Sequence, residues 1–158
     1  MARLRSEVDA LSERAKVLAA IACADRLIHR FDDAIDAEVH EAVRSAWAWA
    51  AGTAWDPAAT VDALEQREDL DDDAVAATAF AVQAVGGDTS GAWFAVNRLV
   101  DAAFARVPYA PDESAFRPLD VDMLAAPVRA DLAWLHLVLA ELRSDPGDTE
   151  AIDRLRRI

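Results

Sequence analysis

Apolar residues recur every three to four positions along almost the whole chain, and this spacing limits the fold more than any other feature. The first stripe contains Leu4, Val8, Leu11, Ala15, Leu18 and Ala22. Such a stripe lies along one face of an α-helix. No alternating run of β-branched residues bounded by turn residues indicates a strand. The sequence therefore predicts an all-α protein.

Capping and helix-breaking residues divide the chain into a predicted bundle of six to seven helices. The predicted helical segments are residues 4–30 with a break at Ser12, a segment from Asp32 or Asp33 to Ala51, and residues 56–66, 74–85, 90–106, 127–143 and 149–158. Three prolines make residues 108–120 the one long predicted loop. At 158 residues a core needs no metal or disulfide. We therefore expect a single helical domain, residues 1–158.

The charge balance is strongly acidic, with 16 Lys and Arg against 29 Asp and Glu and a formal net charge of -13. Nucleic-acid binding depends on basic groups that neutralise phosphates, so this balance argues against a nucleic-acid partner. An anionic membrane surface is disfavoured by the same repulsion. A basic protein partner, in contrast, would be attracted and steered toward the chain.

Cysteine use and the apolar runs indicate a cytoplasmic protein. Cys23 is the single cysteine, so neither a disulfide framework nor a thiolate cluster can form within the chain. The first residues lead into a charged amphipathic segment that lacks the apolar centre of a signal peptide. The longest apolar runs also fall far short of the roughly 20 residues that span a bilayer.

The residues that most often carry chemistry form no recognisable catalytic or metal motif. Di-metal bundles use Glu-x-x-His, but the residues three positions before the histidines are Arg26, Ala37 and Ala133. The glycines form no phosphate-binding loop. Ser90 is expected to cap a helix, and Cys23 to be buried and unreactive. We therefore expect no metal, no cofactor and no enzymatic activity.

Two carboxylates fall inside apolar stripes. Asp25 lies in the middle of the apolar arc of the first long helix, and Asp131 within the arc of the helix at 127–143. A carboxylate there is costly unless it is paired or hydrogen-bonded. One reading is a buried polar clamp with an arginine or a helix N-terminus. The other is a pair of inward acids that line a pocket.

Off-stripe aromatic residues and an acidic run suggest a surface for a protein partner. Trp47 and Phe94 lie away from the apolar faces of their helices, and Trp55 precedes a predicted helix in a loop. The acidic run consists of Glu68, Asp69, Asp71, Asp72 and Asp73. We expect these eight residues to include the partner-binding groups, although a helix in a bundle can also bury two faces.

The run Leu18-Ala-Ala-Ile-Ala-Cys-Ala-Asp-Arg-Leu27 resembles the first long helix of the YjaG-like bacterial proteins, a helical family of unknown function. The tryptophan pair of the second predicted helix and the alanine-rich segment Ala74–Val85 are also similar. So is the end of the chain, where Pro127 opens a long helix and Asp148-x-Glu150-x-Ile152-x-x-Leu155-Arg156 follows. The resemblance implies an all-helical bundle and no particular activity.

The chain is predicted to be a non-enzymatic protein-binding module. Its small size, acidity and helicity loosely resemble the small acidic immunity proteins that neutralise bacterial toxins, which implies a basic partner. The alternative is a helical protein that binds a small molecule or metal through Asp25, Asp131, His29 or His136. A third possibility is a homodimer in which the off-stripe aromatic residues meet across a two-fold axis.

Overall fold

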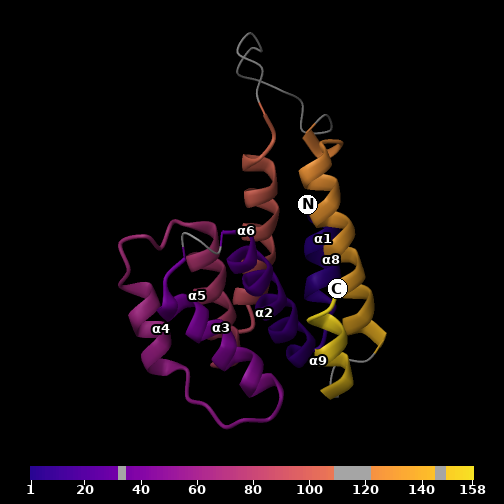
Figure 1. The fold of residues 1–158 in the computed structure, drawn as a ribbon. Helices are drawn as coiled ribbons and strands as arrows, with labels where there is room; N and C mark the ends of the chain where they lie inside the picture. The colour runs from indigo at the N-terminus through magenta and orange to yellow at the C-terminus, as the bar shows by residue number, and fades with distance from the viewer. Residues whose placement is uncertain (32–34, 109–121, 145–148) are drawn as a thin grey trace.

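The computed structural model of the chain describes residues 1–31, 35–108, 122–144 and 149–158, and every regular element in these ranges is a helix (Figure 1). The helices are α1 (Ala2–Asp9), α2 (Glu13–Arg30), α3 (Ala37–Ala50), α4 (Ala58–Glu65), α5 (Asp73–Val85), α6 (Gly91–Ala105), α8 (Ala126–Ser144) and α9 (Thr149–Leu155). The all-α prediction is confirmed. The segment predicted at residues 4–30 is divided before Ser12 into α1 and α2. The described ranges therefore contain eight helices, where six to seven are predicted.

Side-chain caps fix where several of these helices begin. Ser12 accepts a hydrogen bond from the amide of Ala15 at the start of α2, as predicted. Asp72 accepts one from the amide of Ala74 at the start of α5. The predicted cap of the second helix was placed too early, because Asp36 caps α3. Asp32 and Asp33 lie outside the described residues.

Helices α2, α5 and α6 form the centre of the bundle, because the most extensive contacts join these three. In Figure 1, α3, α4 and α5 lie on one side of α2 and α6, and α8 and α9 lie on the other. The core includes large side chains such as Leu18, Ile21, Leu99 and Leu135, all fully buried. Helix α2 therefore separates two parts of the molecule, and its face toward α8 bears the candidate site.

Small residues let the central helices approach closely. Helix α5 is alanine-rich and buried along most of its length, and its one buried hydroxyl, on Thr78, donates to the carbonyl of Ala74 at 2.8 Å. Gly91 begins α6 directly against α5. A Cβ atom at Gly91 would lie 2.7 Å from the carbonyl oxygen of Phe80, so only glycine fits there without a backbone shift.

Candidate functional site

A cavity of about 440 Å³ lies between α2, α3, α8, the residue after α6, and the end of α9 with the residues that follow it. Its lining consists of Ala22, Asp25, Arg26, His29, Arg30, Trp47, Arg106, Ala130, Asp131, Trp134, Leu155, Arg156 and Ile158. We call this the arginine cavity, since four arginines line it against two aspartates. Asp25 and Asp131, the two inward acids of the sequence analysis, both belong to the lining.

Asp131 is the most deeply buried charged group of the arginine cavity, with 2 % of its surface exposed. Its Oδ1 atom accepts hydrogen bonds from Nε of Arg26 at 3.1 Å and from Nη2 of Arg30. Nη1 of Arg106 lies 3.8 Å from its Oδ2 atom. Two arginines one turn apart on α2 thus compensate the buried carboxylate. The predicted clamp exists, and it forms part of the cavity wall.

Two tryptophan rings in the wall are covered by guanidinium groups. The guanidinium of Arg26 lies over the ring of Trp134, with its central carbon 4.4 Å from the ring centroid. The guanidinium of Arg156 lies 5.8 Å from the centroid of Trp47. A guanidinium on an aromatic face is held by cation–π attraction, while its in-plane N–H groups remain able to bind an anion.

Three buried polar atoms of the lining have no hydrogen-bond partner among the described residues. They are Nη1 of Arg30, Nε1 of Trp47 and Oδ2 of Asp131. A buried polar group without a partner costs about 1–3 kcal/mol, and such groups are rare in folded proteins. Two of these atoms are donors and one is an acceptor, and all three belong to side chains that line the arginine cavity.

Asp25 is less buried than the sequence predicts, with a quarter of its side chain exposed. One turn further along α2, Nε2 of His29 lies 3.5 Å from its carboxylate, and the two form an ion pair when the histidine is protonated. The face of α2 at this level borders the arginine cavity and a second hollow of about 320 Å³. The carboxylate therefore faces open space where the apolar stripe predicts close packing.

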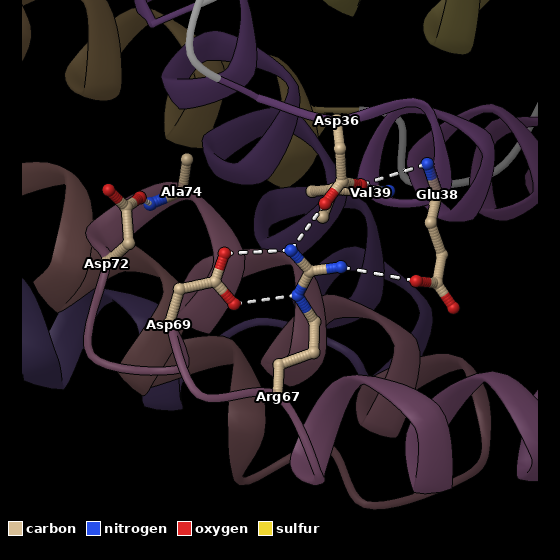
Figure 2. Close-up of polar contacts among 7 residues, drawn as sticks. All are labelled: Asp36, Glu38, Val39, Arg67, Asp69, Asp72 and Ala74. Carbon is tan, nitrogen blue, oxygen red and sulfur yellow. Dashed lines mark hydrogen bonds and ion pairs between the residues drawn. The ribbon is translucent and has the colours of Figure 1, made fainter.

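Part of the predicted acidic surface is an ion-pair cluster around Arg67, shown in Figure 2. Arg67 donates to both carboxylate oxygens of Asp69 at 2.8 Å, to Asp36 before α3, and to Glu38 at 3.2 Å. We call these four residues the Arg67 cluster. The guanidinium holds the pKa of the Asp36 and Asp69 carboxyls below the usual range. The cluster joins the start of α3 to the loop between α4 and α5.

The other acids of the run have different surroundings. Asp72 caps α5 (Figure 2), and Asp73 pairs with Arg98 at 3.4 Å. Partial burial raises the pKa of Asp73. Glu68 and Asp71 are exposed. Asp69, Asp72 and Asp73 thus have structural contacts, and the partner-binding role of the whole run stays a prediction.

The three candidate aromatic residues occupy different environments. Placing Trp47 on an exposed face is wrong, because the ring is 6 % exposed beneath Arg156 and lines the arginine cavity. Trp55 is half-buried against the core. Phe94 is 49 % exposed and packs on Phe80, with ring centroids 5.2 Å apart. Of the three, Phe94 alone is available as an exposed contact.

Sequence reasoning missed the arginines and Trp134 as site residues. Arg26 and Arg30 are four residues apart, which places both on the α2 face that also bears Asp25. That spacing was the one feature of the sequence that could have identified Arg26 and Arg30 as site residues. Nothing in the sequence connects them to Arg106 or Arg156, because those residues meet α2 only through the tertiary fold.

The described residues include no group of three or more His, Cys, Asp or Glu side chains able to hold a metal ion. Cys23 is fully buried, and burial raises the pKa of its thiol to about 12. This thiol stays protonated at neutral pH. Within the same ranges, no helix is long and apolar enough to cross a membrane.

Comparison with known proteins gives a fold and no activity. No family model and no curated protein matches the chain. Among solved structures, it is similar to a DUF416 family protein from Shewanella baltica OS155, with a TM-score of 0.78 and 17 % identity over 96 % of this chain and 90 % of that chain. At this identity the likeness shows the fold alone. It agrees with the all-helical fold, and the YjaG-like label stays a prediction.

Proposed function

We propose that this chain is a binding protein for a small anionic molecule, held in the arginine cavity without being chemically converted. The observation that carries the proposal is the local reversal of charge. The chain has 16 basic groups and a net charge of -13, yet four of its arginines line this one cavity against two aspartates. Cations gathered in a concave wall raise the local concentration of anions.

The arrangement of the arginines suits oxyanion binding. Arg26 and Arg30 are fixed by Asp131, and Arg26 and Arg156 lie against indole rings. A guanidinium fixed in this way presents planar N–H donors that match carboxylate or phosphate oxygens. The volume of about 440 Å³ lies within the roughly 300–1,000 Å³ of small-molecule sites. A small carboxylate or phosphate is therefore the ligand that the wall fits best.

Calorimetric titration with phosphate, succinate and malate tests the proposal. We expect saturable binding of at least one of the three at constant ionic strength. The double variant Arg106→Gln and Arg156→Gln should weaken that binding at least roughly tenfold, since each arginine contributes a charge-assisted contact. These two arginines are exposed, and their replacement leaves the hydrogen bonds of Asp131 with Arg26 and Arg30 in place.

Arg3→Gln with Arg5→Gln is the matched control, because it also removes two positive charges, from exposed positions outside the arginine cavity. This control variant should bind the same probe as tightly as the unaltered chain does. Equal weakening by the pair Arg3→Gln and Arg5→Gln would show a general charge effect. That result, or the absence of saturable binding for all three probes, would overturn the proposal.

As a second candidate function, we propose that the acidic side of the chain binds a basic protein, as an immunity-type protein binds a toxin. The observation that favours this function is an excess of acid near the Arg67 cluster. Three carboxylates surround the one guanidinium, and Glu68 and Asp71 are exposed beside them in sequence. Such a surface would steer a basic partner toward the chain.

Capture experiments with the product of an adjacent gene test this second function. Binding should weaken as salt rises from about 50 to 500 mM, because exposed charges are screened. Glu68→Gln with Asp71→Asn should weaken capture, whereas Glu150→Gln with Asp153→Asn, on exposed positions of α9, should not. Capture that is insensitive to salt and to the first pair would contradict the function.

A further inference from the structure

We infer that the ligand of the arginine cavity carries a hydroxyl group beside its anionic group, as a hydroxy acid does. The inference rests on the proposed function and adds a second recognition element to it. It starts from the chemistry of the three unpartnered atoms, two donors and one acceptor. A simple anion can accept from the donors, but it offers nothing to the acceptor.

The acceptor, Oδ2 of Asp131, belongs to a carboxylate that is almost fully buried and lines the arginine cavity. Its other oxygen, Oδ1, already accepts from Arg26 and Arg30. Nη1 of Arg106 lies 3.8 Å from Oδ2, which is too long for a direct hydrogen bond. A ligand hydroxyl would supply the donor that Oδ2 lacks.

The donors are Nη1 of Arg30 and the indole N–H of Trp47, whose side chain is also more than nine-tenths buried. Because Nη2 of Arg30 donates to Asp131, the unpartnered Nη1 and Oδ2 belong to the two side chains of one ion pair. An oxyanion and a hydroxyl on one small ligand would therefore be recognised by a donor and an acceptor of the same ion pair.

A ligand with an ammonium group in place of the hydroxyl fits less well. The charge of Asp131 is already compensated by two arginines, and the wall as a whole has more arginines than aspartates. A second cation would be repelled by these guanidinium groups. A neutral hydroxyl donates its hydrogen bond without adding positive charge, so the surroundings favour a hydroxy acid over an amino acid.

Succinate and malate separate this inference from the proposed function, because malate is succinate with one added hydroxyl. In calorimetric titrations of the intact chain, we expect one malate enantiomer to bind roughly tenfold or more tightly than succinate, as a hydrogen bond to a buried charged group would give. Equal binding of succinate and both malates would overturn the hydroxyl inference and leave the anion proposal standing. Failure of phosphate, succinate and malate alike would overturn both.

Asp131→Asn identifies the group that recognises the hydroxyl. The asparagine oxygen can still accept from Arg26 and Arg30, while an amide donor replaces the acceptor Oδ2. The ratio of malate affinity to succinate affinity should then fall to about one. Arg106→Gln should weaken the binding of both ligands but retain more of the malate preference than Asp131→Asn does. An unchanged preference in folded Asp131→Asn would contradict the assignment. If this variant does not fold, the comparison of ligands on the unaltered chain still decides the inference.

Discussion

Replacing Asp131 with alanine is expected to lower the free energy of unfolding by about 3 kcal/mol. The carboxylate is buried and pairs with Arg26 and Arg30, which are themselves largely removed from solvent. Without it, two guanidinium groups of α2 lie side by side with no described counter-ion. Urea denaturation measures the loss, and the melting temperature should fall by about 10 °C for a chain of this size.

Asp9→Ala is the matched control for this loss. It removes the same side chain from an exposed pair, in which Asp9 lies 3.8 Å from Arg5. Exposed pairs contribute little, so a change within about 0.5 kcal/mol is expected. A similar small effect for Asp131→Ala would mean that the arginines find other partners, and that Asp131 is no clamp.

Arg67→Gln is expected to destabilise the chain by about 1 kcal/mol at neutral pH, a modest value because solvent screens the exposed carboxylates of the Arg67 cluster. The effect should depend on pH in a definite direction. In the folded chain the pKa of Asp36 and of Asp69 lies below the ordinary 3.8. Their contribution is therefore present above that value and lost as pH falls through it toward the lower folded pKa.

Urea titrations at pH 7, 5, 4 and 3 check this prediction. The curves of the unaltered chain and Arg67→Gln should differ at neutral pH and converge at low pH, where the carboxyls are protonated. Burial raises the pKa of Asp73, so its contribution to stability changes with pH in the opposite direction. That contribution is the same in both proteins and does not affect the difference between them. Arg44→Gln, which removes an exposed partner of Glu41, should show little change at any pH. A constant difference across the range would show that Arg67 acts through packing.

The fold was predictable because its signals are local. The apolar period and the capping Ser12 each act within one or two turns of a helix, and the structure has helices with ends close to those predicted. The second helix shows the limit of such signals. Several aspartates precede it, and capping preference alone does not distinguish Asp36 from those just before it.

The site was predictable only in part, because its chemistry comes from distant segments. Asp131 could be identified since a charge inside an apolar stripe needs a partner. Its partners, Arg26 and Arg30, are more than a hundred positions away, so periodicity could not identify them. The exposed position predicted for Trp47 was wrong for a related reason. A helix that is covered on two faces buries residues that a single stripe assigns to the surface.

The alanine-rich packing of α2 against α5 and α6 has a consequence for the site on the opposite face of α2. Alanine has no side-chain rotamers to restrict, and close helix contact leaves the backbone little freedom. Arg26 and Arg30 thus project from a rigid support, and Asp131 fixes their guanidinium groups. Ordering long arginine side chains costs conformational entropy. Here much of that cost is met during folding, before a ligand binds, so the cavity is preorganised.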